Sequence, residues 1–172
     1  MTVIIPAISR SDPDYYNLLV ANYIFGGSGF GSWLMEEIRQ KRGLSYSVYS
    51  YLSTYQNSGY LRISLQTKNE SINLAKNIIR EQVDKLSRFD VEDAKITATK
   101  NAILRSFEMR ADTNRKILNL ISSINYLNLD LNYFENYKNN LKQVNKDSIK
   151  AALNRAMDFD NISVFTVGKS IE

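Results

Sequence analysis

The 172-residue chain contains neither cysteine nor histidine. Without cysteine it can form no disulfide, bind no metal through thiolates and use no thiol nucleophile. Without histidine it has no imidazole general base, so a Ser-His triad and a histidine-ligated zinc ion are both excluded within this chain. Any zinc chemistry in which the protein takes part must therefore use a metal held by another domain or chain.

Proline, glycine and long apolar runs are also scarce. With 2 Pro and 7 Gly, long disordered or collagen-like segments are excluded. No run of about 18 apolar residues occurs, so no membrane-spanning helix is predicted. The net charge is only +4, and the 22 Lys and Arg are interleaved with 18 Asp and Glu. Nucleic-acid-binding proteins concentrate their basic residues in a patch, so we expect a solvated mixed surface and no nucleic-acid partner.

What is present is an ordinary globular composition, long enough for one domain of about 150 residues with little left for a second. Apolar residues at helical spacing predict helices over 12–25, 32–42, 70–86 and 90–109, with more beginning at Asp112, Asn132 and Asp147. Alternating residues predict strands over 2–9, 46–53, 60–67 and 161–167, the middle two joined as a hairpin through residues 57–59. We predict a single α+β domain over 1–172, a two-layer structure in which a mainly antiparallel sheet packs on helices.

Three details of this prediction depend on single residues. Pro6 lacks a backbone N–H, which restricts the first strand to an edge of the sheet. Ser11 or Asp12 is predicted to cap the first helix, with a proline in its first turn, where a missing N–H costs nothing. Asp90 and Asp93, three residues apart, are predicted to form a weak capping box at the start of another helix.

A glycine-rich segment, Gly26-Gly27-Ser28-Gly29-Phe30-Gly31, lies between the first two predicted helices. A dinucleotide-binding fingerprint needs glycines at i, i+2 and i+5 after a strand, whereas here the third position is Ser32 and the segment follows a helix. We therefore expect no phosphate or dinucleotide at this segment. It is predicted to be a flexible loop, in which several positions need a positive φ or a close backbone approach.

Arg39 and Tyr46 form the more informative polar pair. Arg39 lies in the last turn of the second helix, which Gly43 is placed to terminate, and Tyr46 begins the strand that follows. Both side chains are hydrogen-bond donors that could hold a peptide carbonyl or a developing oxyanion. The alternative is structural: Arg39 pairs with Glu36 and with the helix C-terminus, and Tyr46 is a half-buried strand aromatic. Spacing alone favours the structural alternative.

Residues 26–50, GGSGFGSWLMEEIRQKRGLSYSVYS, carry a resemblance to a known family. Together with residues 12–16 and 164–168, this stretch strongly resembles the C-terminal, zinc-free half of the pitrilysin/insulinase family of zinc metallopeptidases, to which mitochondrial processing peptidase and many bacterial zinc proteases belong. The resemblance implies one half of a clam-like chamber built from two similar α+β halves. Where the family commonly has Ser-Arg-Leu, this chain has Ser32-Trp33-Leu34, a departure that bears on peptide specificity and on the docking of the halves.

The resemblance also assigns roles to individual residues. Arg39 and Tyr46 match the Arg and Tyr, seven residues apart, that the zinc-free half presents to the zinc across the chamber. It implies that they bind the substrate backbone near the scissile bond and are catalytic as oxyanion-type donors. A substrate-binding or hinge role is implied for four glycines: Gly26, Gly27, Gly29 and Gly31.

The implied function is that of the substrate-binding, non-zinc half of a zinc metalloendopeptidase acting on peptides. The chain alone is expected to be inactive and to bind no cofactor, with zinc in a partner half that carries His-x-x-Glu-His, in a dimeric association. The alternative is a non-catalytic structural or core-type subunit with the same fold. We expect an excised or truncated domain, because Met1 is followed almost at once by the family's first strand, and a soluble protein of the bacterial cytoplasm or periplasm.

Overall fold

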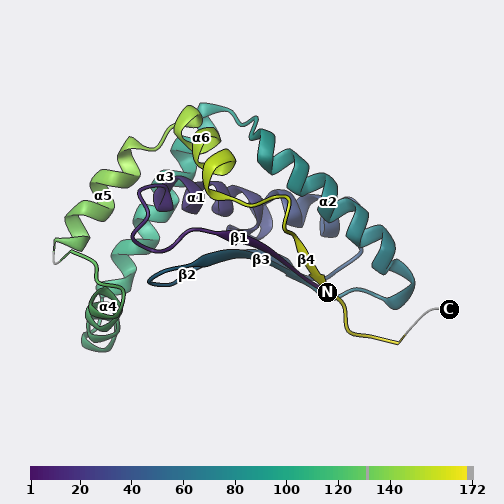
Figure 1. The fold of residues 1–172 in the computed structure, drawn as a ribbon, viewed down its shortest axis with the longest axis horizontal. Helices are drawn as coiled ribbons and strands as arrows, with labels where there is room; N and C mark the ends of the chain where they lie inside the picture. Colours follow the sequence, from purple (N-terminus) through teal and green to yellow (C-terminus); the bar gives the residue numbers. More distant parts are fainter. Residues whose placement is uncertain (131, 170–172) are drawn as a thin grey trace.

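The computed structural model describes residues 1–130 and 132–169. It is an α+β fold in which helices cover one face of a curved antiparallel sheet, as the sequence predicts (Figure 1). The strands are β1 (Thr2–Ala7), β2 (Val48–Thr54), β3 (Gly59–Leu65) and β4 (Ser163–Phe165). The helices are α1 (Tyr15–Asn22), α2 (Ile72–Arg88), α3 (Asp93–Glu108), α4 (Asn114–Tyr126), α5 (Tyr133–Gln143) and α6 (Lys146–Ala156).

The sheet has the strand order β2-β3-β1-β4, with antiparallel neighbours throughout. β2 and β3 form the predicted hairpin, although β2 begins at Val48 rather than at Tyr46. The hairpin residues predicted to be buried are buried: Leu61, Ile63 and Leu65. Because side chains alternate along a strand, Tyr49 and Tyr51 lie on the opposite face of the sheet, where both are exposed.

β1 is an interior strand, so the predicted edge position of this strand is wrong. β1 pairs with β3 along its whole length and with β4 over residues 2–4. The Pro6 carbonyl accepts a hydrogen bond from the Asp158 N–H at 3.1 Å. In an extended strand the nitrogen and the carbonyl of one residue point to the same side. At Pro6 this is the side of β1 that faces β4, and the pairing with β4 ends before it comes to Pro6. The missing N–H therefore costs the sheet no hydrogen bond.

Two helix starts differ from the prediction. α1 begins after Asp14 rather than at Ser11 or Asp12. Asp12 instead accepts a hydrogen bond from the Asp14 N–H at 2.8 Å, a local turn that competes with helix formation. The capping box predicted for α3 is also wrong, because α3 begins later and the Asp90 carboxylate pairs with Lys146 of α6 at 2.8 Å.

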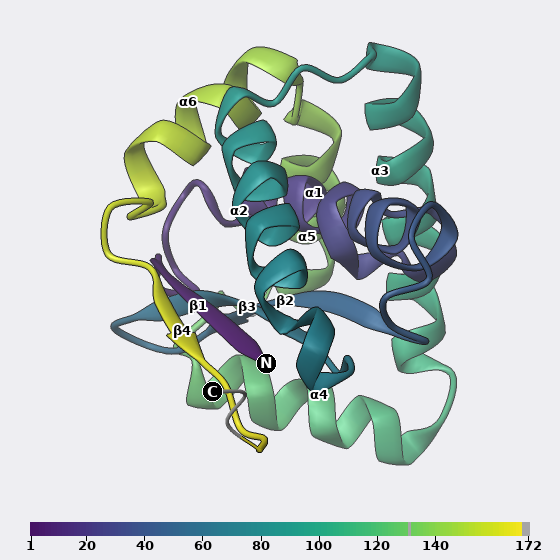
Figure 2. The ribbon, with the colours of Figure 1, turned by 90° about the vertical axis from the view of Figure 1, so that its right-hand side faces the viewer.

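The core lies between the sheet and the helices on its covered face. α2 buries most of the apolar side predicted for it, at Ala75, Ile79, Val83 and Leu86, whereas Ile72, predicted to belong to the same side, is half-buried. α4 lies on the other side of the sheet from α1 and α2 (Figures 1 and 2). There Gln56 of the hairpin turn donates a hydrogen bond to the Tyr126 carbonyl. Among the described residues, no helix is long and apolar enough to cross a membrane.

Candidate functional site

The chain between α1 and β2 is wound into wide helical turns. α1 passes directly into a π-helical turn at Tyr23–Gly27, a short 3₁₀ turn follows at Gly29–Gly31, and a second π-helical segment spans Met35–Gln40. The two predicted helical segments are therefore confirmed, but the flexible loop predicted between them is wrong, because Gly26 and Gly27 lie inside the end of the first segment and Gly29–Gly31 forms the 3₁₀ turn. π-Helical turns are rare and frequently occur at functional sites, so this region is the first place to look for one.

Gly26 and Gly27 pack too closely against their neighbours to carry a side chain freely. A Cβ on Gly26 would lie 2.4 Å from the Oγ of Ser50 and 2.7 Å from its backbone nitrogen. A Cβ on Gly27 would lie 3.0 Å from the side-chain nitrogen of Asn22. Asn22 and Ser50 are themselves joined, because the Ser50 hydroxyl donates to the Asn22 Oδ1 at 2.7 Å. These contacts fasten the end of α1 to β2.

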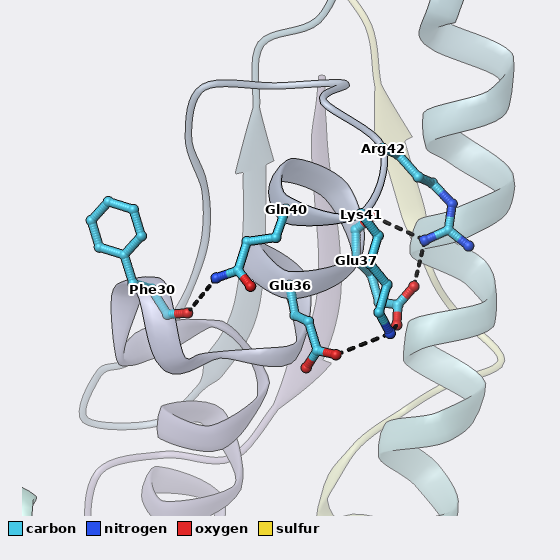
Figure 3. Close-up of polar contacts among 6 residues, drawn as sticks. All are labelled: Phe30, Glu36, Glu37, Gln40, Lys41 and Arg42. Atoms are coloured by element: carbon cyan, nitrogen blue, oxygen red, sulfur yellow. Dashed lines mark hydrogen bonds and ion pairs between the residues drawn. The ribbon is translucent and has the colours of Figure 1, made fainter.

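Gly29 and Gly31 flank Phe30 at the exposed tip of the same region. Gly29 has a φ of +69°, a conformation that glycine adopts without strain. The Phe30 carbonyl accepts a hydrogen bond from the Gln40 side chain at 3.0 Å (Figure 3). The Gly31 carbonyl accepts one from Lys95 of α3 at 3.4 Å. The tip is therefore tied both to the second π-helical segment and to α3.

Trp33, at the position where the resemblance leads us to expect arginine, joins this region to α2. Its ring is half-buried and lies 6.2 Å from the ring of Phe89. The Nζ of Lys85, on α2, lies 4.4 Å from the centre of the Trp33 ring. Such a cation–π contact contributes about 0.5–1 kcal/mol at an exposed site. Trp33 thus packs the start of the second π-helical segment onto α2.

Arg39 lies on the second π-helical segment, with its guanidinium 4.5 Å from the centre of the Phe30 ring. The structural alternative predicts an ion pair between Arg39 and Glu36, which is absent from the described part of the chain. Glu36 instead pairs with Lys41 at 2.9 Å (Figure 3). The ring contact leaves the edge of the guanidinium, where its N–H donors lie, available to a bound molecule.

Glu37 holds the C-terminal end of the same segment. It pairs with Lys41 at 2.6 Å and also with Arg42 (Figure 3). Hydrogen bonds from Lys41 and then from Arg42 lower the pKa of the Glu37 carboxyl, and the same contacts with Glu37 and Glu36 raise the pKa of Lys41. Arg42 donates in addition to the Glu37 carbonyl at 3.0 Å, which helps to satisfy the helix end.

The second π-helical segment ends at Gln40, earlier than predicted, and Gly43 closes the turn that follows it. Its φ is +61°, its N–H donates to the Arg39 carbonyl, and the Leu44 N–H donates to the Ile38 carbonyl, both at 2.9 Å. This is a Schellman closure widened by one residue, as a π-helix requires. The Leu44 carbonyl in turn accepts a hydrogen bond from the Thr67 hydroxyl at 2.6 Å. The turn before β2 is thereby held against the end of β3.

Tyr46 projects from this turn into solvent. It is 94% exposed, so the alternative prediction of a half-buried strand aromatic is wrong. The neighbouring Ser45 is buried, and its hydroxyl donates to the Ser47 carbonyl at 2.7 Å. This bond fixes the backbone on both sides of Tyr46. An exposed phenol on such a turn can donate to a bound molecule without disturbing the core.

Arg39 and Tyr46 line the same open pocket, of about 830 Å³. The structure thus brings the two predicted residues to one site. Its remaining walls come from residues 42–45 and from five residues after β3, which are Gln66, Thr67, Lys68, Glu70 and Ser71. No sequence motif identifies this second wall. The signal that could have found it is the hairpin register, because pairing Leu65 with Val48 places the residues after β3 beside those before β2.

The donor set of this pocket is unsuited to a metal ion. Among residues 1–130 and 132–169, no three His, Cys, Asp or Glu side chains cluster so that they could hold one. The side chains that line the pocket are mainly hydroxyls and cations, which bind carbonyls and anions rather than zinc. A zinc ion facing this pocket would need ligands from another domain or chain.

Comparison with known proteins identifies the family. The family model described as peptidase M16 inactive domain matches residues 1–103, which include Arg39, Tyr46 and the glycine-rich segment. The chain belongs to the peptidase M16 inactive-domain family. The resemblance to the zinc-free half of pitrilysin/insulinase peptidases is thereby confirmed.

Relatives of this M16 domain differ in the activity that their names state. The domain is 38% identical over 142 residues to the non-peptidase homolog YmxG of Helicobacter pylori, and the match covers 77% of this chain and 31% of that protein. It is 33% identical over 103 residues to the uncharacterized zinc protease YmxG of Bacillus subtilis, covering 59% of this chain and 25% of that protein.

A solved structure supports the same assignment. The peptidase M16 inactive domain from Pseudomonas fluorescens matches with a TM-score of 0.83 and 28% identity, over 94% of this chain and 38% of that chain. The M16 chain therefore spans well under half the length of each of these three proteins.

Proposed function

We propose that this M16 domain is the substrate-binding half of a zinc metalloendopeptidase acting on peptides, opposite a zinc site carried by another domain or chain. The observation that supports the proposal most directly is that Arg39 and Tyr46 line one open pocket. Tyr46 stands exposed on a fixed turn, and Arg39 is held by an aromatic ring rather than by a carboxylate. Both donors are thus placed to serve a ligand.

The chemistry of the two side chains suits a peptide carbonyl. When a peptide bond is hydrolysed, negative charge develops on the carbonyl oxygen, and a phenol O–H and a guanidinium N–H can each donate to it. Loss of one such donor typically costs about 10²–10³ in kcat. Neither group has to act as a general base, which fits a chain without histidine. The zinc and the base belong, in this proposal, to a homologous partner half with His-x-x-Glu-His, in a dimeric association.

The substrate-binding or hinge role is best supported at one end of the glycine-rich segment. Gly26 and Gly27 are packed against β2 and α1, which opposes movement there. Around Gly29 there is open space for a Cβ, and at Gly31 the nearest described atom would lie 3.9 Å away. Because Phe30 lies between them and contacts Arg39, a shift of this tip would move the guanidinium.

Replacement of the Tyr46 hydroxyl tests the proposed role. Tyr46→Phe, in the protein together with its zinc-carrying half, should lower kcat for peptide cleavage about 10²-fold or more. KM and Tm should change little, because Tyr46 is 94% exposed and its ring is kept. Tyr126→Phe removes an exposed hydroxyl at the end of α4 and is the matched control. An unchanged kcat in the Tyr46 variant would overturn the assignment.

The second candidate function is a non-catalytic structural subunit with the same fold. The name of the Helicobacter pylori relative, a non-peptidase homolog, favours it. The two candidates require different partners, and mass spectrometry of the native complex distinguishes them. A parent chain or partner with His-x-x-Glu-His supports the peptidase. A stable partner without that motif leaves Arg39 and Tyr46 no zinc to face and supports the structural role.

A further inference from the structure

The pocket that contains Arg39 and Tyr46 is one end of a longer groove. A second open pocket of about 1000 Å³ adjoins it, and the two share four lining residues: Gln66, Thr67, Lys68 and Glu70. The second pocket is lined in addition by the start of α2 and by residues 166–169, which follow β4. We call the two pockets together the basic groove, which extends from Tyr46 to Lys169.

Cations outnumber carboxylates on the walls of the basic groove. Its cationic residues are Arg39, Arg42, Lys68 and Lys169, and the acidic residue among its described walls is Glu70. Glu70 pairs with Lys68 at 3.6 Å, where the two side chains are 75% and 83% exposed. Water screens such an exposed pair, so a carboxylate on a bound peptide can replace Glu70 at little cost.

Glu37, which pairs with Arg42, does not change the sign of this excess charge. It does not line the groove and is largely covered, at 15% side-chain exposure. Even when Glu37 and Glu70 are both counted against the four cations, the excess of positive charge remains. A groove with such an excess raises the local concentration of acidic ligands and disfavours basic ones.

We propose that the basic groove selects peptides with acidic side chains near the bond to be cleaved, on the side of that bond that runs from Tyr46 towards β4. This inference rests on the proposed function, because Arg39 and Tyr46 place the scissile carbonyl at one end of the groove. Acidic side chains beyond that carbonyl would then lie against Lys68 and Lys169. The Thr67 hydroxyl donates to the Leu44 carbonyl, and the two lysines supply the charge that distinguishes an acidic side chain from a neutral one of the same size.

Binding is the quantity to measure, with the zinc chelated so that cleavage cannot contribute. Short fluorescent peptides with the same sequence, except for two central residues that are both Glu, both Gln or both Lys, are titrated by anisotropy into the protein with its partner half. We expect the Glu peptide to bind about 5- to 20-fold more tightly than the Gln peptide at low salt, with the difference largely lost near 0.5 M salt. Equal binding of the Glu and Gln peptides would overturn the inference.

Charge reversal in the groove provides the matched test. Lys68→Glu with Lys169→Glu should remove or invert the preference for the Glu peptide, since both lysines are exposed on the groove wall. The control pair, Arg80→Glu with Arg105→Glu, makes the same charge change at exposed helix positions outside the groove and should keep the preference.

The two proposals fail separately in these experiments. If the lysine pair has no effect on peptide preference, the acidic selection is wrong, whereas the Tyr46→Phe cleavage result is unaffected. If the acidic preference follows the lysines but the complete protein cleaves no peptide, the inference holds as a binding property and the peptidase proposal fails.

Discussion

Arg39 and Tyr46 are positioned by neighbouring residues that do no chemistry themselves. The ring of Phe30 makes a cation–π contact with the Arg39 guanidinium. The hydroxyl of the buried Ser45 forms the hydrogen bond that fixes the turn on which Tyr46 lies. Gly26, one helical segment earlier, lets the backbone approach β2 closely enough for the whole region to sit on the sheet. At the scale of single residues, the site therefore depends on packing as much as on its two donors.

Gly26→Ala should destabilise the domain by about 1–3 kcal/mol, because the new methyl group overlaps a backbone atom that cannot move aside easily. That atom is the Ser50 nitrogen, which would lie 2.7 Å from the added Cβ. Urea unfolding followed by circular dichroism measures the loss. Gly31→Ala, where the nearest described atom would lie 3.9 Å away, should stay within about 0.5 kcal/mol of the natural protein. Similar losses in both variants would contradict the packing argument.

At the scale of elements, the second π-helical segment is the part that joins the site to the rest of the fold. Its start packs on α2 through Trp33, and its end is closed by Gly43 and by the pairs that Glu37 makes. In a π-helix each N–H pairs with the carbonyl five residues back, so one more carbonyl is left unpaired at its end than in an α-helix. Arg42, which Glu37 pairs with, donates to one of these carbonyls. The ionisation of Glu37 should consequently matter to the fold.

Glu37→Gln should remove a pH-dependent contribution to the free energy of unfolding. Because Lys41 and Arg42 lower the pKa of the Glu37 carboxyl, the ionised form stabilises the folded state. That contribution, about 1 kcal/mol or less for such a surface pair, is present above the ordinary carboxyl pKa and is lost as pH falls through the lowered one. The natural protein should therefore exceed the variant in stability at neutral pH and match it in acid.

Urea unfolding across this pH range measures the difference. The control is Glu81→Gln on the exposed surface of α2, which has no ion pair in the described part of the chain. A difference for Glu37→Gln that persists unchanged in acid would show that the carboxylate charge is not its cause.

For the whole molecule, one core connects the sheet to the helices, and the candidate site is built on segments that flank β2 and β3. Ile63 occupies the centre of the sheet, between Ser50 of β2 and Val3 of β1, and is fully buried. The groove residues after β3 follow directly from this strand. Loss of the core should therefore unfold the site together with the rest of the domain.

Ile63→Ala should cost about 2–5 kcal/mol, because the cavity it leaves lies where sheet and helices meet. Unfolding should remain a single transition, detected at the same denaturant concentration by circular dichroism and by the fluorescence of Trp33 near the site. Ile121→Ala, on the exposed side of α4, should change stability by no more than about 0.5 kcal/mol. Separate transitions for the two probes would show that the site region unfolds independently of the core.

Local patterns were sufficient to predict most of the elements. Alternation at Leu61, Ile63 and Leu65 predicts the hairpin because a strand exposes successive residues to opposite faces, and Gly43 predicts a helix end because glycine tolerates a positive φ. Pro6 and the helix caps were predicted less well. The effect of a missing N–H at Pro6, or of a carboxylate at Asp90, depends on which residue lies beside it in the fold. These residues are Asp158 and Lys146, and both are distant in the sequence.

By itself the sequence determined that this chain has no histidine or cysteine chemistry of its own, that it forms an α+β fold, and that Arg39 and Tyr46 are candidate site residues. These follow from composition, from periodicities of a few residues and from the family resemblance of residues 26–50. Only the tertiary structure decided that Glu36 pairs with Lys41, that Tyr46 is exposed, and that Lys68 lines the same pocket as Tyr46. The reason is physical: these facts depend on the hairpin register and on competition among charged neighbours, which long-range packing sets.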